Sequence, residues 1–130
     1  MNLNDKLSIL LVEDTELNQK LMQLSLARFN YVVSIASNGL EGFEMYKKNK
    51  FDLILMDIMM PIMDGFESTK LIRKFESENP ILGRIPILAY TANTMNNDRE
   101  ICMKSGMDDV IENPFDINKF REIISKLHNV

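Results

Sequence analysis

The stretch of residues 51–67 constrains the fold more than any other part of the chain. It contains the apolar run 53–56 (LILM), which ends at Asp57. A short, continuous apolar run suits a strand that is buried on both faces, as in a parallel sheet, although periodicity alone does not exclude a helix. Pro61 and the pair Asp64-Gly65 then interrupt regular structure. Asp57 is therefore predicted to end a strand at the carboxyl edge of a sheet, where open α/β folds place their ligands.

Apolar segments alternate with amphipathic segments along the whole chain. Strands are predicted over 6–12, 31–36, 53–56, 87–90 and 110–111, and a helical stripe follows each of them. The first stripe is Leu17, Leu21, Leu24 and Ala27, with Thr15 as the predicted helix cap. This alternation predicts βαβ units with right-handed crossovers, and thus an α/β fold with one five-stranded parallel sheet and helices on both faces. Without a repeat or linker, we expect residues 1–130 to form a single domain.

Composition excludes several classes of function. The formal charge of −4 argues against a protein that binds nucleic acid directly, because such a protein would carry a basic patch. No apolar run approaches the ~20 residues that span a bilayer, so no direct membrane contact is predicted. The single cysteine, Cys102, excludes an internal disulfide and fits the reducing cytoplasm, which is the expected location. We expect Cys102 to be a small buried apolar residue.

Acidic side chains follow two of the predicted strands. Glu13-Asp14 ends the first strand and Asp57 ends the third. In a sheet of order 2-1-3-4-5 these strands are neighbours and their carboxyl ends flank the switch point; that order is adopted from the family named below. Clustered carboxylates repel one another and need a cation or solvent to stay ionised. Mg²⁺ suits such a set, because it takes a few carboxylates together with water and phosphate oxygens.

Thr91 follows the fourth strand and would place a hydroxyl group beside Asp57. A carboxylate nucleophile, a metal ion and a hydroxyl donor suit phosphoryl transfer to an aspartate, where catalysis is mostly positioning and charge neutralisation. Each group also has an ordinary structural role. Glu13-Asp14 could begin a helix, where negative charges interact favourably with its positive end. Thr91 could be a helix cap, and Asp57 alone could be a solvated residue at the end of a strand.

Four segments of the chain resemble the response regulator receiver domain of the CheY-like superfamily, and most resemble the receivers of hybrid sensor histidine kinases. They are 12–18 (VEDTELN), 55–67 (LMDIMMPIMDGFE), 87–92 (ILAYTA) and 106–109 (GMDD). The resemblance implies a flavodoxin-like fold, and a phosphoacceptor in two-component or phosphorelay signalling that is not an enzyme but supports its own phosphoryl transfer and slow dephosphorylation. Asp57 would accept the phosphoryl group from a phosphohistidine on a histidine kinase or a histidine phosphotransfer domain.

The resemblance also implies roles for the residues around Asp57. Glu13, Asp14, Asp57 and the backbone carbonyl of Met59 would hold Mg²⁺, and Thr91 would be the switch hydroxyl. The first helix and the Pro114-Phe115 loop would meet the phosphotransfer partner, and the last two helices would carry output or homodimer contacts. Phe115 is a candidate for this interface and equally for the core.

Two positions depart from the family pattern. Asn113 stands where a lysine usually pairs the phosphoryl oxygens, and Val110 stands where a switch aromatic is common. A hydrogen bond from a charged ammonium is worth ~1.5–3 kcal/mol, against ~0.5–1.5 kcal/mol for a neutral donor. Asn113 should therefore stabilise the phosphorylated state less than the usual lysine would.

These departures keep a second function open, which is a pseudo-receiver that binds protein partners without being phosphorylated. An aspartyl-nucleophile hydrolase is disfavoured, because Met59 stands where its second acid is expected. A flavin binder of the same architecture is also disfavoured, because no glycine-rich phosphate loop follows the first strand of this chain. Whether the chain is a stand-alone regulator or a part of a hybrid kinase stays open at this stage.

Overall fold

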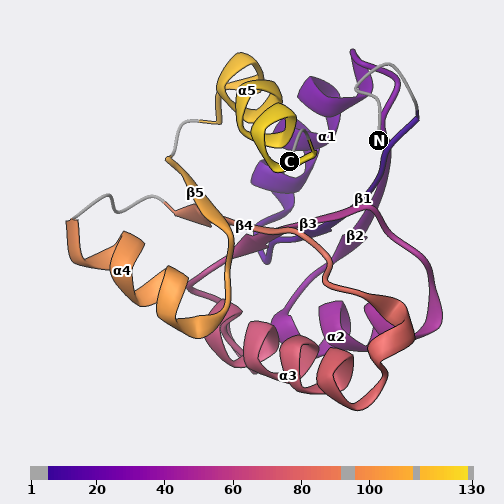
Figure 1. The fold of residues 1–130 in the computed structure, drawn as a ribbon. Helices are drawn as coiled ribbons and strands as arrows, with labels where there is room; N and C mark the ends of the chain where they lie inside the picture. Colours follow the sequence, from indigo (N-terminus) through magenta and orange to yellow (C-terminus); the bar gives the residue numbers. More distant parts are fainter. Residues whose placement is uncertain (1–5, 92–95, 113–114, 129–130) are drawn as a thin grey trace.

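The computed structural model describes residues 6–91, 96–112 and 115–128. Within them, five parallel strands form one sheet of order β2-β1-β3-β4-β5 (Figure 1). The strands are β1 (Ser8–Val12), β2 (Val32–Ala36), β3 (Leu53–Asp57), β4 (Ile87–Thr91) and β5 (Asp109–Glu112). Both the parallel sheet and its strand order confirm the predicted fold class, a doubly wound α/β fold.

Helices cover both faces of the sheet (Figure 1). They are α1 (Glu16–Ala27), α2 (Gly39–Lys48), α3 (Gly65–Glu78), α4 (Asn96–Ser105) and α5 (Ile117–His128). α1 and α5 lie on one face, and α2, α3 and α4 lie on the other. Residues 79–86 contain a single 3-10 turn, η1 (Pro80–Leu82). No helix among the described residues is long and apolar enough to cross a membrane.

Successive strand residues point to opposite faces, and this alternation produces two apolar cores. Leu10 and Ile54 pack with Ile72 of α3 and with Cys102 of α4, which is buried as predicted. Ile9, Leu11, Leu53 and Leu55 pack on the other face with the α1 and α5 residues Met22, Leu26, Phe120 and Ile124. Because the central strands are buried on both faces, their sequences read as continuous apolar runs.

In the first helix, the apolar stripe named from the sequence is not the side that packs on the sheet. Leu17, Leu21 and Leu24 are 65%, 54% and 69% exposed, whereas Met22 and Leu26 are buried against the sheet. α1 carries apolar residues on two opposite sides, so helical periodicity correctly indicates a helix but cannot tell which side is buried. The three leucines (the α1 leucines) therefore form an apolar surface in solvent.

Helix starts and stops follow local chemistry. Asn38 and Asp64 cap α2 and α3, accepting hydrogen bonds from the backbone N–H groups of Glu41 and Glu67, both at 2.9 Å. Thr15 occupies the cap position of α1 but makes no side-chain capping bond, so that prediction holds only for position. Gly106, at φ 110°, ends α4 in the conformation that favours glycine.

Candidate functional site

The ends of β1 and β3 bring the predicted acidic residues together. Val12 pairs with Met56 at the end of the β1–β3 ladder, so Glu13 and Asp57 follow as the next residues on adjacent strands. Carboxylate oxygens of Glu13, Asp14 and Asp57 all lie within 4.8 Å of one another. The convergence predicted from the strand ends is therefore present in the fold.

Backbone contacts fix the two residues that follow β1. The Glu13 side chain is buried, and its Oε2 accepts a hydrogen bond from the Asp14 N–H at 2.9 Å. The Glu13 N–H donates to the Ala36 carbonyl at 3.0 Å, and the Gln19 side chain donates to the Glu13 carbonyl at 2.6 Å. Asp14 itself is exposed. One carboxylate of the cluster is thus held by the fold, while another faces solvent.

Asp57 is half-buried between these acids, and its protonation reflects that position. Burial, followed by the hydrogen bond and negative charge of Glu13 and then by Asp14, raises the pKa of Asp57 to about 8. Burial together with the charges of Glu13 and Asp57 also raises the pKa of Tyr90, the β4 residue paired with Asp57. Three carboxylates in such proximity favour either a bound proton or a bound cation.

The β3–α3 loop depends on a glycine for its path. The Gly65 N–H donates to the Ile58 carbonyl at 2.9 Å. A Cβ atom at Gly65 would overlap the Asp57 carbonyl oxygen and come within 3.0 Å of Met56 Cγ. Gly65 therefore lets the start of α3 approach the end of β3. The sequence marked this glycine as a breaker, but its close approach to the Asp57 backbone is visible only in the fold.

A strained residue in the same loop was not predicted. Ile62 has φ 73°, which is unfavourable for a β-branched residue. It is the central residue of a tight turn in which the Met63 N–H donates to the Pro61 carbonyl at 2.8 Å. The side chains of Ile62 and Met59 are 77% and 78% exposed. No sequence signal identifies isoleucine as a residue of positive φ, because that conformation normally selects glycine or asparagine.

The remaining predicted site residues lie on β4, on β5 and after β5. Thr91 ends β4 one residue beyond Tyr90, the partner of Asp57 in the ladder, while its side chain lies outside the described part of the structure. Val110 is partly buried against the core beneath α2, α3 and α4. Asn113 lies outside the described residues. Phe115 is partly buried against the rings of Tyr90 and Phe120, at centroid distances of 6.2 and 5.6 Å, which favours its role in the core.

The donor set fits a hard divalent cation. Glu13, Asp14 and Asp57 offer only carboxylate oxygens, and no histidine or cysteine joins them in the described part of the chain. Mg²⁺ prefers such oxygen ligands and retains water, which the exposed Asp14 side permits. The chemistry of these residues therefore agrees with the metal predicted from the sequence.

Comparison with known proteins identifies the family. The family model of the response regulator receiver domain matches residues 9–125. Hybrid signal transduction histidine kinase F of Dictyostelium discoideum is 38% identical over 118 residues, which cover 91% of this chain and 11% of that protein. Histidine kinase 5 of Arabidopsis thaliana is 34% identical, covering 93% of this chain and 16% of that protein. The chain thus spans only a small part of these curated relatives.

Solved structures agree with the same assignment. The receiver domain of sensor histidine kinase PA1611 from Pseudomonas aeruginosa, with a magnesium ion coordinated in its active site cleft, is 34% identical with a TM-score of 0.82; the match covers 94% of this chain and 97% of that one. The co-crystal structure of the Saccharomyces cerevisiae phosphotransfer protein Ypd1 with the receiver domain of Ssk1 gives 29% identity and a TM-score of 0.85, over 93% of this chain and 88% of that one. The family match over residues 9–125 and the shared fold show that this chain belongs to the response regulator receiver domain family of two-component and phosphorelay signalling.

Proposed function

We propose that Asp57 accepts a phosphoryl group from a phosphohistidine and that this changes which partners the domain binds. The supporting observation is the convergence of Glu13, Asp14 and Asp57 within 4.8 Å at the ends of adjacent strands. A carboxylate held in this way is a positioned nucleophile, because β3 and the close approach of Gly65 fix its backbone.

In the proposed reaction, a carboxylate oxygen of Asp57 forms a bond to phosphorus while the N–P bond of the phosphohistidine breaks and the imidazole leaves. Glu13, Asp14, Asp57 and the Met59 backbone carbonyl would hold Mg²⁺, which when bound neutralises charge on the transferred group. The Thr91 hydroxyl would pair with the phosphoryl oxygens afterwards. Catalysis here rests on positioning, so the domain acts as a phosphoacceptor that supports its own transfer and slow dephosphorylation.

The donor would be a histidine kinase or a histidine phosphotransfer domain. The exposed α1 leucines support this, since they provide an apolar contact surface on a helix next to the acidic site. The yeast relative, whose receiver was crystallised with Ypd1, supports the same class of partner. Replacing Leu21 with Gln should slow transfer from the cognate donor. Labelling by a small phosphodonor should stay unchanged.

Intact mass spectrometry tests the phosphoacceptor. Incubation with Mg²⁺ and acetyl phosphate should add the mass of one phosphoryl group, and EDTA or Asp57→Asn should abolish the addition. Asp64→Asn is a matched control, because it removes a carboxylate from the same loop while asparagine still caps α3. Labelling that survives Asp57→Asn would place the acceptor elsewhere.

The alternative is a pseudo-receiver that binds its partners without phosphorylation, and Val110 and Asn113 favour it. Absence of any added phosphoryl mass, under conditions that label an ordinary receiver, would support this alternative. If labelling occurs, Asn113→Lys should lengthen the phosphoryl lifetime by adding a charged donor. We propose that residues 1–130 act as one receiver unit in the cytoplasm, as a regulator or within a longer kinase, with homodimer contacts on α4 and α5.

A further inference from the structure

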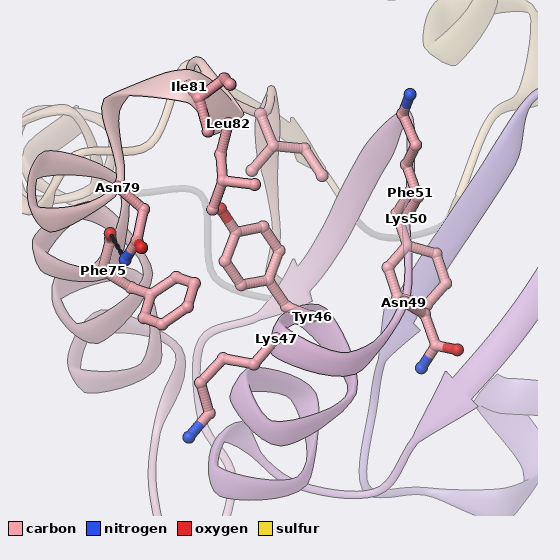
Figure 2. Close-up of a pocket in the computed structure, with 10 residues that line it drawn as sticks. Tyr46, Lys47, Asn49, Lys50, Phe51, Phe75, Asn79, Ile81 and Leu82 are labelled. Atoms are coloured by element: carbon pink, nitrogen blue, oxygen red, sulfur yellow. Dashed lines mark hydrogen bonds between the residues drawn. The ribbon is translucent and has the colours of Figure 1, made fainter.

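A pocket of about 550 Å³ lies at the edge of the sheet opposite Asp57. It is bounded by the C-terminal ends of α2 and α3, by η1 and by Phe51, which precedes β3 (Figure 2). Its volume is within the ~300–1,000 Å³ that is typical of small-molecule sites. Nothing in the proposed phosphoryl chemistry uses this pocket, because Asp57 ends β3 whereas Phe51 precedes it.

Aromatic and aliphatic side chains form most of the wall. The rings of Tyr46 and Phe75 meet edge to face at a centroid distance of 6.0 Å. Leu82 and Ile81 extend the apolar surface from η1, with Ile81 96% exposed (Figure 2). Exposed apolar side chains beside a hollow offer a ligand both a cavity and a rim.

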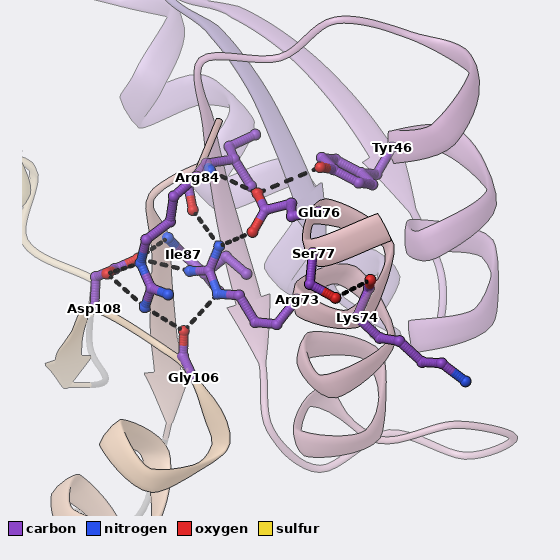
Figure 3. Close-up of polar contacts among 10 residues, drawn as sticks. Tyr46, Arg73, Lys74, Glu76, Ser77, Arg84, Ile87, Gly106 and Asp108 are labelled. Carbon is purple, nitrogen blue, oxygen red and sulfur yellow. Dashed lines mark hydrogen bonds and ion pairs between the residues drawn. The ribbon is translucent and has the colours of Figure 1, made fainter. Parts of the chain in front are cut away.

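Buried hydrogen bonds hold the wall in place before any ligand binds. Glu76 accepts from the Tyr46 hydroxyl at 3.3 Å and from the Ile85 N–H at 2.7 Å (Figure 3). The Asn79 side chain donates to the Phe75 carbonyl at 2.9 Å. Burial and the charge of Glu76 raise the pKa of Tyr46 to about 12, so its hydroxyl keeps its proton at neutral pH. A preformed wall lowers the ordering cost that a ligand must offset.

The charge of the wall differs in sign from that of the whole chain. None of the ten lining residues is acidic, and two are lysines, although the chain carries a formal charge of −4. The Lys47 ammonium lies 3.1 Å from a Glu44 carboxylate oxygen and over the Phe43 ring. Lys50 is exposed and forms no ion pair within the described parts of the chain. Lys50 is therefore the positive charge available to a ligand.

We propose that this pocket binds a small organic anion with an apolar body. Its ring or alkyl carbons would pack on Tyr46, Phe75 and Leu82, and its carboxylate or sulfonate would pair with Lys50. A hollow of about 550 Å³ favours a small molecule over the flat apolar contact that the α1 leucines provide. This inference does not depend on phosphorylation of Asp57.

The anionic dye 1-anilinonaphthalene-8-sulfonate is the probe, and the neutral dye N-phenyl-1-naphthylamine is its uncharged counterpart. Titration of the folded full chain should show saturable one-to-one binding of the anion, with a Kd on the order of 10–100 μM for a ligand of this size. Amide NMR shifts should change around Tyr46, Phe51 and Leu82. They should stay constant along α1.

Three variants separate charge from packing. Lys50→Glu should weaken binding of the anion about 5-fold through loss of the ion pair and added repulsion, and should leave the neutral dye unaffected. Lys48→Glu is the matched control, because Lys48 lies on α2 and does not line the pocket; its effect should stay below about 2-fold. Leu82→Asn should weaken the binding of both dyes by about 3-fold. Amide spectra of each variant verify the fold.

Several results would overturn the proposal. If the Lys50→Glu and Lys48→Glu variants bind the anionic dye with equal affinity, Lys50 does not recognise the charge of the ligand. Shifts confined to the α1 leucines would move the site to another surface, and binding that fails to saturate would indicate the loose association typical of partly unfolded protein. Shifts at the pocket that depend on protein concentration without dye would assign it to a second copy of the chain.

Discussion

The two edges of the sheet carry charge clusters of opposite design. At the carboxyl edge, Glu13, Asp14 and Asp57 bring three acids together, and none of them forms an ion pair with a lysine or arginine in the described residues. At the amino edge, Arg73 and Arg84 face Glu76 and Asp108, two positive charges against two negative ones (Figure 3). The first cluster favours a bound proton or a cation from outside the protein, and the second is neutral within the fold.

Hydrogen bonding shows why the amino edge is structural. The Arg73 guanidinium donates to the carbonyls of Gly106 and Ile85 and to the carboxylates of Glu76 and Asp108, all at 2.8–2.9 Å. It thereby ties α3 to the segments that enter β4 and β5. A largely buried charge that makes four hydrogen bonds maintains one arrangement of the fold. An unbalanced cluster is typical of a site that binds a ligand.

The largest effect on stability is expected at the amino edge, where the charges of Arg73 and Arg84 balance those of Glu76 and Asp108 (the balanced edge). Arg73→Met keeps much of the side-chain volume but leaves Glu76 and Asp108 without their shared cation, so the free energy of unfolding should fall by roughly 3–5 kcal/mol. Urea denaturation at pH 7 measures the change. Arg84→Met is the control, because Arg84 is exposed and its pair with Asp108 should be worth under about 1 kcal/mol. Equal losses in the two variants would contradict the assigned role of Arg73.

Adding Mg²⁺ should stabilise the carboxyl edge, where Glu13, Asp14 and Asp57 lie together. Mg²⁺ that binds only the folded chain should raise the free energy of unfolding by about 2.7 kcal/mol at one hundred times its Kd. Thermal unfolding with increasing Mg²⁺, and again after EDTA, measures this linkage. The gain should disappear in Asp57→Asn and persist in Asp64→Asn. A gain of equal size in Asp57→Asn would place the ion elsewhere.

In the absence of metal, removing one of the three acids at the carboxyl edge should relieve their mutual repulsion. The pKa of Asp57 lies near 8 in the folded chain against 3.8 in the unfolded chain, so its contribution to stability is full below pH 3.8 and is lost as pH rises towards 8. Asp57→Asn should flatten this pH dependence. It should raise the free energy of unfolding at pH 8 by about 1–2 kcal/mol, after the shift is discounted for solvent screening of a half-buried group.

Urea denaturation in EDTA from pH 4 to pH 8 compares the two proteins. The curves should converge near pH 4 and separate steadily above it. Asp64→Asn again serves as the control, because its carboxylate is not part of the three-acid cluster. A wild-type chain that is more stable than Asp57→Asn at pH 8 without metal would contradict the crowding of these acids.

The unbalanced edge was predictable from the sequence, because each acid follows an apolar run that identifies its strand end. The adjacency of β1 and β3 was not, since strand order came from the family resemblance. The balanced edge was missed altogether. Arg73 and Glu76 lie on α3, and Asp108 precedes β5. A single charged residue at such a position is normally expected to face solvent. Only the docking of α3 beside β4 and β5 brings them together.

Apolar residues were misread for a related reason. Periodicity gave the helix α1 but not its buried side, because Leu17 and Leu21 compete with Met22 and Leu26 for that assignment. The pocket was equally hidden, since Tyr46, Phe51 and Phe75 meet only when α2, β3 and α3 assemble. Backbone strain at Ile62 leaves no trace in the sequence, because its conformation is imposed by the loop around the acidic site.

That strain gives the smallest expected effect and a further contrast between the edges. Ile62→Gly should relieve the positive φ, and the flexibility gained by the unfolded chain should offset part of the benefit, leaving a net gain of about 0.5–1 kcal/mol in unfolding free energy. Met59→Gly is a close match, because both side chains are about equally exposed and Met59 does not adopt positive φ. Met59→Gly carries the same entropy cost but relieves no positive φ. The free energy of unfolding of Ile62→Gly should therefore be higher than that of Met59→Gly by about 1–2 kcal/mol, as measured by urea denaturation. Equal stabilities would show an unstrained loop, and the carboxyl edge would then differ from the amino edge in charge alone.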